Sequence, residues 1–380
     1  MSDVRAKEPS SKELERLQSE NTALNEREFV ERKEILRSMP QRVFLQVDGP
    51  CNADCRFCSR GTQTRPFDLD AYLRDLAPAL DPAIERSREL LLTGSGELLA
   101  LPQAGRILDH FNARFPHVEK YLATNASHRD ARLWEKVCDP ASRYTLQISL
   151  HAASSAMHRI MTRTEEHGRV LENLRALAQS RRKTGWPRLN LMFVMTTLNA
   201  EELPAFVRLA HELGADRVIA CYLFVYEAAQ KYLSLYYRQD LANRVIDEAR
   251  RAALELDVEL RLPSKFGEAH GARPASERCQ GAAKTCPEPW QQIMVRQDGG
   301  VLPCDAYGDF SQNIRMGFEE VWNGQAYRAL RRSAAAGEGC MKTCGRRSPS
   351  SVDDWSSHAM GRHKDDAEMI REYRRAMERP

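Results

Sequence analysis

The stretch RVFLQVDGPCNADCRFC, residues 42 to 58, joins an alternating apolar run to three closely spaced cysteines. Val43, Leu45 and Val47 recur at every second position, which is the period of a β-strand. The cysteines follow at once in a loop containing Gly and Pro, and their number is odd. The stretch therefore predicts a strand whose following loop carries thiols for a purpose other than disulfide pairing.

The same alternation of strand and helix signals continues to about residue 222. Strands are predicted at 42–48, 89–94, 119–124, 144–150, 189–195 and 217–223, and helices at 69–80, 102–115, 129–137, 168–182 and 201–213. Six such units in succession predict an α/β fold in which helices cover a parallel sheet. We expect the sheet to curl into a partial (β/α)6 TIM-like barrel, and a doubly wound sheet is the alternative.

Polar segments follow four of the predicted strands. They are the cysteine loop, TGSGE at 93–97, TNAS at 124–127 and SLH at 149–151. In barrels of parallel strands, the chemistry takes place at the carboxyl ends of the strands. The order of these segments therefore predicts one functional site at that end of the barrel.

Composition narrows the class of protein. The chain has 380 residues, and 56 Lys and Arg nearly balance 53 Asp and Glu, so that the net charge is +3. This balance indicates neither a nucleic-acid footprint nor a membrane-binding patch. Because no leader or membrane-spanning stretch is evident, we expect a cytoplasmic protein, where ten cysteines serve metal binding or catalysis better than disulfides.

Cys51, Cys55 and Cys58 have the spacing of ligands to an iron–sulfur cube. Three thiolates on one loop occupy three corners of a [4Fe-4S] cluster and leave the fourth iron open to another ligand. Structural zinc is the alternative, although it takes four ligands, usually in two pairs.

A second group of cysteines lies near the carboxyl end of the chain. Cys286 and Cys304 flank a predicted hairpin, 292–297 and 300–303 with its turn at 298–299, while Cys340 and Cys344 follow one helix later. Four ligands in two pairs suit zinc or a fully ligated [4Fe-4S] cluster. Of the remaining cysteines, Cys279 is a possible extra ligand, Cys138 is expected in the core, and Cys221 ends the sixth strand.

The motif C-x3-C-x-F-C, with Phe57 before the last cysteine, resembles the signature of the radical SAM superfamily. The resemblance covers about residues 42 to 225. It implies that the open iron binds S-adenosylmethionine, and that one-electron reduction releases a 5'-deoxyadenosyl radical. The protein positions and shields this chemistry, which belongs to the cofactor.

The resemblance also implies contacts to the cofactor. TGSGE is similar to the family's Gly-Gly-Glu segment, so that Ser95, Gly96 and Glu97 would meet the methionine amino group, although Leu98 stands where a proline is usual. Phe57 would lie against the adenine. The remaining polar contacts would come from the ends of the third and fourth strands, namely Thr124, Asn125 and Ser149.

The segments 286–310 and 316–331, with the closing cysteine pair, resemble the SPASM/twitch extension of many radical SAM enzymes. The few thiols present imply one auxiliary [4Fe-4S] cluster, as in the twitch form. The organisation we expect is a small α+β domain with a β-hairpin after the barrel. Its segments are a helical extension at 1–40, the barrel at 41–225, a connecting helix (about 228–256) and strand within 226–263, the auxiliary domain at 264–350 and a polar tail at 351–380.

These features predict a radical SAM oxidoreductase that dehydrogenates or epimerises a small polar metabolite such as a sugar, cyclitol or nucleoside. Cys221 is a candidate hydrogen-atom donor in such a reaction. The expected partners are the small-molecule substrate and an external one-electron reductant of the flavodoxin or ferredoxin type, with no nucleic acid or membrane. The alternatives are a maturase acting on a ribosomal peptide or protein, and a zinc-stabilised binding protein without enzymatic activity.

Overall fold

The computed structural model describes residues 10–58, 65–226, 228–268, 286–304 and 310–337. Its centre is a curved sheet in which six strands pair in parallel and in chain order. This order confirms the partial barrel and differs from that of a doubly wound sheet, in which the strand order reverses. The strands are β1 Arg42–Gln46, β2 Glu89–Thr93, β3 Glu119–Thr124, β4 Tyr144–Ser149, β5 Arg188–Met195 and β6 Arg217–Tyr222.

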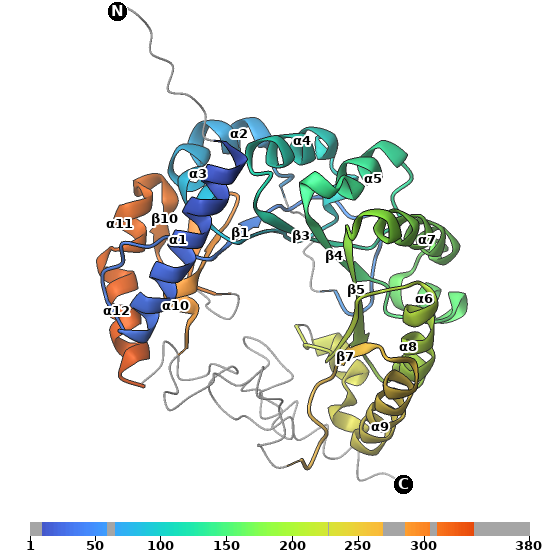
Figure 1. Cartoon of the computed structure of the whole chain (residues 1–380). Helices are drawn as coiled ribbons and strands as arrows, with labels where there is room; N and C mark the ends of the chain where they lie inside the picture. Colours follow the sequence, from blue (N-terminus) through green and yellow to red (C-terminus); the bar gives the residue numbers. More distant parts are fainter. Residues whose placement is uncertain (1–9, 59–64, 227, 269–285, 305–309, 338–380) are drawn as a thin grey trace, which may run out of the picture.

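Helices cover the convex side of this sheet (Figure 1). Alternate strand residues, such as Val43 and Leu45 of β1, are fully buried against them, while Phe44 and Gln46 face the concave side and are half-buried. The helices are α2 Leu69–Asp75, α3 Ala77–Arg86, α4 Ala104–Arg114, α5 Ala131–Cys138, α6 Ser155–Thr162, α7 His167–Thr184, α8 Leu203–Glu212 and α9 Gln239–Leu256.

Two helix predictions need correction, and one helix was missed. The single helix expected at 69–80 is two helices, because Pro78 lacks the N–H needed to continue α2 and instead occupies the first turn of α3. The long helix expected from 228 is α9 alone, which two 3₁₀ segments, Ala228–Leu233 and Leu235–Tyr237, precede. Helix α6 was not predicted; the Ser154 side chain caps its first turn.

The sheet continues beyond the barrel on both sides. Strand β7 (Glu259–Arg261) pairs in parallel with β6, and β8 (Gln292–Val295) pairs in parallel with the outer edge of β1. The predicted hairpin is present, since β9 (Gly300–Leu302) returns antiparallel to β8 and Gly299 in the turn has φ +85°. Strand β10 (Gln312–Asn313) completes a sheet of ten strands.

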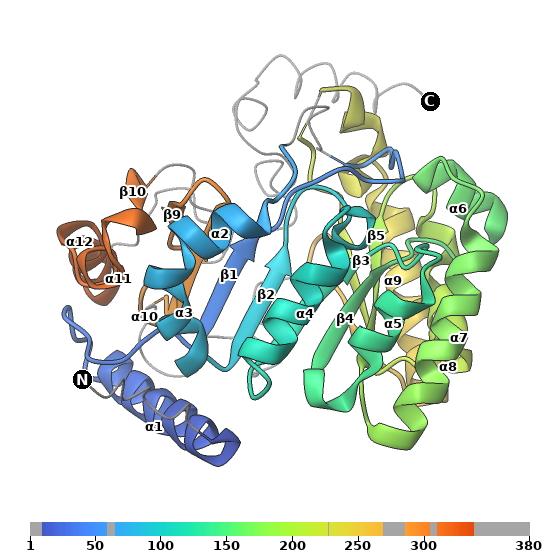
Figure 2. The ribbon, with the colours of Figure 1, turned by 90° about the horizontal axis from the view of Figure 1, so that it is seen from above.

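The carboxyl-terminal helices and the amino-terminal helix pack together on one side of the barrel (Figure 2). Helix α1 (Ser11–Val30) lies beside α3 and α10. Its buried positions are mostly polar, namely Asn21, Asn25 and Glu28, so that hydrogen bonds rather than an apolar stripe attach it. The other helices of this group are α10 Glu288–Gln291, α11 Phe318–Trp322 and α12 Gln325–Ala335. Among the described residues, no helix is both long and apolar enough to cross a membrane.

Charged residues form a rim at the amino ends of the strands on the concave side. Arg42 pairs with Glu288 at 2.9 Å, and Arg217 pairs with Glu259 at 2.6 Å. Every strand from β1 to β7 except β4 begins with such a residue: Arg42, Glu89, Glu119, Arg188, Arg217 and Glu259. The rim therefore concentrates ionised groups at the end of the barrel opposite the cysteine loop.

Lys120 of β3 is fully buried on the convex side. Its Nζ donates to the carbonyl oxygens of Phe115 at 2.6 Å, Val118 at 3.0 Å and Ser142 at 3.1 Å. Burial, with a smaller contribution from the charge of Arg143, lowers the pKa of Lys120 to about 7. The side chain thus ties the end of α4 to the loop before β4.

Replacing Lys120 with methionine should lower the free energy of unfolding by about 2 to 4 kcal/mol, because three buried carbonyl oxygens lose their donor. Urea unfolding measures this loss. The unfolded chain binds more protons than the folded chain between about pH 7 and the ordinary value of 10.5. The contribution of Lys120 to stability should therefore rise with pH across this window, and the variant should lose that rise.

The matched control for this change is Lys183→Met, at the exposed end of α7. It should alter stability by less than about 0.5 kcal/mol. Equal losses in the two variants would contradict the structural role of Lys120.

Candidate functional site

The cysteine loop leaves the carboxyl end of β1, and the rest of the protein holds it through its backbone. Cys51 and Cys55 are half-buried and Cys58 is exposed. The amide N–H groups of Asp54 and Arg56 donate to the carbonyl oxygens of Thr162 and Met161 at 3.1 and 2.9 Å. Helix α6, which the sequence analysis missed, therefore anchors the loop from the side of β4.

The glycine-containing loop after β2 presses against the start of the cysteine loop. Gly49 N–H donates to Ser95 O at 2.8 Å, and Ser95 N–H donates to a carboxylate oxygen of Asp48 at 2.7 Å. Gly96 has φ +122°, and a Cβ there would lie 2.1 Å from the carbonyl oxygen of Gly49. Only glycine permits this approach, which leaves exposed backbone at Gly94 and Gly96 beside the cysteines.

Glu97 lies directly behind this loop and is buried. Its carboxylate accepts hydrogen bonds from the hydroxyl of Thr124 at 2.8 Å and from the backbone N–H of Asn125 at 2.7 Å. Burial raises the pKa of Glu97, and the hydrogen bonds from Asn125 and Thr124 oppose this effect. The side chains of Glu97 and Thr124, which the resemblance implies as cofactor contacts, thus bond to the protein and join the β2 and β3 loops.

Asn125 lies beside the first cysteine. Its Nδ2 donates to Asn52 Oδ1 at 2.7 Å and lies 3.9 Å from Cys51 Sγ. Ser127 donates to Asn125 Oδ1, and Asn52 donates to Ser127. Neither Asn52 nor Ser127 was among the predicted site residues. An Asn followed by Ser two positions later is the pattern of an Asx turn, and this signal could have drawn attention to Ser127.

Phe57 and His151 connect the cysteine loop to β4. Their rings are 4.6 Å apart in an edge-to-face arrangement, and Phe57 also packs against the apolar cluster of Leu223, Val225 and Tyr237 after β6. His151 is buried and its Nδ1 accepts the backbone N–H of Val194 at 3.1 Å. Because burial lowers the pKa of His151 to about 3, this imidazole is neutral at physiological pH.

Two other predicted residues face the concave side of the sheet. Ser149 ends β4, and Cys221 lies opposite Val194 near the end of β6. Burial raises the pKa of Cys221 to about 11, so the thiol keeps its proton at neutral pH. Both side chains therefore lie at the same end of the barrel as the cysteine loop.

The second cysteine group is described only in part. Cys286 and Cys304 are buried at the open end of the β8–β9 hairpin, while Cys279, Cys340 and Cys344 lie outside the described residues. Tyr327 packs close by, and burial raises its pKa, to which the charge of Cys304 adds. Arg331 lies over the rings of Trp322 and Tyr327, at 4.5 and 5.3 Å from their centroids.

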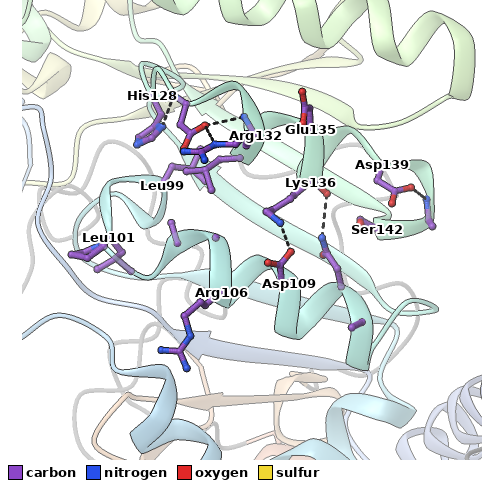
Figure 3. A pocket seen from close by; sticks show the side chains of 18 of the residues that line it. Leu99, Leu101, Arg106, Asp109, His128, Arg132, Glu135, Lys136, Asp139 and Ser142 are labelled. Atoms are coloured by element: carbon purple, nitrogen blue, oxygen red, sulfur yellow. Dashed lines mark hydrogen bonds and ion pairs between the residues drawn. The ribbon is translucent and has the colours of Figure 1, made fainter.

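A large surface groove lies elsewhere, between α4 and α5 on the convex side (Figure 3). It measures about 1240 Å³, and none of the predicted site residues lines it. Its charged side chains bond to one another, since Lys136 pairs with Asp109 and Arg132 pairs with Asp130. The candidate site is therefore the carboxyl end of the barrel and not this groove.

Comparisons with known protein families match both halves of this arrangement. Residues 49–210 match the model of the radical SAM superfamily, and residues 286–346 match that of the SPASM iron–sulfur cluster-binding domain. The chain belongs to the radical SAM superfamily and carries a C-terminal SPASM domain. No curated protein matches it.

Solved structures share the fold of this radical SAM protein. SuiB of Streptococcus suis is 16% identical with a TM-score of 0.61, and the match covers 83% of this chain and 72% of SuiB. The protein anSMEcpe with bound AdoMet is also 16% identical, with a TM-score of 0.56 and coverage of 78% and 84%. These likenesses establish the radical SAM type of barrel with its small C-terminal domain.

Radical SAM proteins of this type use S-adenosylmethionine, a [4Fe-4S] cluster that binds it and auxiliary iron–sulfur clusters. The described residues fit the first cluster, because three thiols share one loop beside exposed glycine backbone. Among the described residues, no three Cys, His, Asp or Glu side chains converge to hold one metal ion. A cube divides its thiolates among separate irons and so requires neighbouring, not convergent, cysteines.

Replacing Gly96 with alanine should disturb the radical SAM site, because the new Cβ would collide with the backbone of Gly49 and the backbone would be strained at φ +122°. We expect a loss of roughly 2 kcal/mol in stability and a lower affinity for S-adenosylmethionine. Thermal unfolding and equilibrium binding measure these effects. In the control Gly105→Ala, the nearest atom to the new Cβ is 3.6 Å away, so unchanged binding is expected; equal effects in both variants would contradict the argument.

Proposed function

We propose that this radical SAM protein dehydrogenates or epimerises a small, neutral, polar metabolite held on the concave face of its sheet. Cys51, Cys55 and Cys58 would hold the cluster that binds S-adenosylmethionine, and Cys286 and Cys304 would be among the ligands of an auxiliary cluster. When bound, the cofactor and its cluster supply reductive bond cleavage and hydrogen-atom abstraction. An external donor of the flavodoxin or ferredoxin type would supply the electron.

The observation that carries the substrate class is the set of neutral polar groups on the concave face. Gln147 and Asn190 lie opposite each other on β4 and β5, and Ser149 is two residues beyond Gln147. The hydroxyl of Tyr121 donates to the amide oxygen of Gln147. In the part of the chain that the structure describes, the side chains of Ser149 and Asn190 form no hydrogen bond. Hydroxyl and amide groups of a neutral substrate match such donors and acceptors.

The charged groups of the same face support a neutral substrate. Arg42, Arg188 and Arg217 each have a carboxylate partner at the amino-end rim. Their charges are therefore compensated before a substrate binds. An anionic substrate would have to compete with Glu288, Glu119 or Glu259 for these guanidinium groups.

The cysteine loop and the described cysteines of the second group, Cys286 and Cys304, lie toward opposite ends of β1. Gln292, which follows α10, is opposite Arg42 at the start of β1, whereas the cysteine loop follows the end of that strand. Five residues of strand separate these levels by about 16 Å. A substrate on the concave face would lie between the two, where it could lose a hydrogen atom near one site and an electron toward the other.

In dehydrogenation the substrate would lose two electrons and two protons. One of each would leave as the hydrogen atom that becomes part of 5'-deoxyadenosine, and the second proton would go to solvent or a base. The residues that hold an auxiliary cluster would provide the acceptor for the second electron. In epimerisation the substrate radical would instead take a hydrogen atom from the Cys221 thiol, which is protonated at neutral pH. The sulfur radical left behind would regain the thiol by taking an electron from the external donor and a proton from solvent.

A peptide substrate is the second candidate. Phe224 and Tyr226 follow β6 at the carboxyl end of the barrel, are 42% and 40% exposed, and have ring centroids 6.2 Å apart. Exposed aromatic pairs suit apolar peptide side chains. SuiB and anSMEcpe, which share the fold, have been solved with a precursor peptide and with the Cp18Cys peptide respectively. A maturase would form product only when a precursor peptide is supplied.

Two cysteine substitutions separate the roles of the clusters. Cys55→Ala should abolish 5'-deoxyadenosine formation, because the first cluster loses a ligand. Cys304→Ala should keep some cleavage and lose the substrate product. Anaerobic iron and sulfide analysis with product chromatography measures both, with about eight iron atoms per chain expected before substitution if two four-iron cubes are present.

The control for these substitutions is Cys138→Ala on α5, which should leave iron content and cleavage unchanged. Full cleavage by Cys55→Ala, or full product yield from Cys304→Ala, would count against the proposal.

Cys221→Ala distinguishes the two reaction types. If the enzyme epimerises its substrate, the variant should lose the product while still forming 5'-deoxyadenosine, and the wild type in D₂O should place one deuterium on the product because thiol protons exchange. If it dehydrogenates, product formation should persist in the variant. Mass spectrometry measures both the yield of the product and its deuterium content. Deuterium incorporation that survives the substitution would exclude Cys221 as the donor.

A further inference from the structure

Three side chains beside the first cysteine form a closed ring of hydrogen bonds. Asn52 Nδ2 donates to Ser127 Oγ, Ser127 Oγ donates to Asn125 Oδ1, and Asn125 Nδ2 donates to Asn52 Oδ1, each at 2.7 Å. Asn52 belongs to the cysteine loop, whereas the other two follow β3. The ring thus joins the two loops through side chains alone.

The ring fixes the orientation of both amides. Reversing the Asn125 amide would place its oxygen against Asn52 Oδ1 and its NH₂ against the Ser127 backbone N–H, which donates to Asn125 Oδ1 at 3.0 Å. Both changes would bring like groups together. Because one Nδ2 proton is donated to Asn52, the second proton of this amide points toward Cys51 Sγ, which lies 3.9 Å from Nδ2.

Hydrogen bonds also fix the backbone at Asn125. Its N–H donates to Glu97 Oε2, and the next residue, Ala126, donates to Thr124 Oγ1 at 3.1 Å. Because Glu97 and Thr124 are buried and bonded to each other, the position of the amide follows from the packed core. Hydrogen bonds in a connected set of this kind strengthen one another.

We propose that this ring directs the Asn125 amide onto the sulfur of Cys51 and thereby raises the reduction potential of the cluster that Cys51 holds. The inference rests on the ligation proposed above. A thiolate bound to iron carries more negative charge than a thiol and is the better acceptor. Since reduction adds negative charge to the cluster, a donor at one of its sulfurs stabilises the reduced form. Asn125 is then a positioning residue for electron entry.

The test compares five variants of the full-length, reconstituted protein without S-adenosylmethionine, the fifth being Ser127→Thr. The midpoint potential of the first cluster is measured by redox titration followed by electron paramagnetic resonance. Asn125→Ala removes the donor, Asn125→Asp replaces it with a carboxylate, Ser127→Ala opens the ring but keeps the amide, and Asn112→Ala changes an amide in the outer groove.

The expected potentials fall in the order wild type, Ser127→Ala, Asn125→Ala and Asn125→Asp, while Asn112→Ala matches the wild type. With limiting reductant, cleavage of S-adenosylmethionine by Asn125→Ala should slow by roughly tenfold. Ser127→Thr keeps the hydroxyl and should restore the potential lost in Ser127→Ala. If Asn125→Ala fails to assemble its cluster, the two Ser127 variants provide the comparison.

An unchanged potential in the Asn125 and Ser127→Ala variants would overturn the inference. So would a loss of affinity for S-adenosylmethionine at constant potential, because the amide would then contact the cofactor and not the sulfur. Failure of the underlying ligation is distinguishable, since Cys51→Ala would then keep its full iron content.

Discussion

The pairing of β1 on both of its edges determines how the rest of this protein is arranged. One edge bonds in parallel to β2 and begins the barrel, and the other bonds in parallel to β8 and begins the SPASM hairpin. A single strand therefore sets the register of both units. It also separates their cysteines, because the loop of Cys51 follows its carboxyl end while Cys286 and Cys304 lie near its amino end.

The concave face between these ends is divided by charge. At the amino-end rim, Arg42, Arg188 and Arg217 pair with carboxylates, whereas amide, hydroxyl and thiol groups occupy positions closer to the cysteine loop. In the low dielectric of a closed site, an unpaired charge beside a reacting radical would bind water or counterions. Near the cysteine loop, the carboxylates of Asp48 and Glu97 accept hydrogen bonds from the protein and Asp54 pairs with Arg163, so these charges are compensated as well.

The strands were predictable because short segments with apolar residues at alternate positions indicate β-strands, and the bounds of β3 were predicted to the residue. The same pattern did not reveal α6, because two of its three buried residues, His158 and Thr162, are polar and do not mark an apolar face. At the candidate site, the sequence indicated loops that the structure brings to the same end of the barrel, but it could not tell which side-chain oxygens already accept hydrogen bonds within the protein. Glu97 and Thr124 bond to each other, and only packing of the β2 and β3 loops determines that.

The amino-terminal segment explains why β8 stays on the edge of β1. Trp290 Nε1 donates to Lys33 O at 2.8 Å, and Trp322 Nε1 donates to Ser38 O at 2.9 Å. Asn25 Nδ2 in turn donates to Trp290 O at 2.7 Å. These bonds join residues more than 250 positions apart in the chain, and they connect the segment before β1 with Trp290, just before β8, and with Trp322 of α11. The loop-closure entropy of bringing β8 to β1 is large, and these hydrogen bonds offset it. Sequence periodicity carries no trace of these bonds, because their acceptors are backbone carbonyl oxygens, which every residue has.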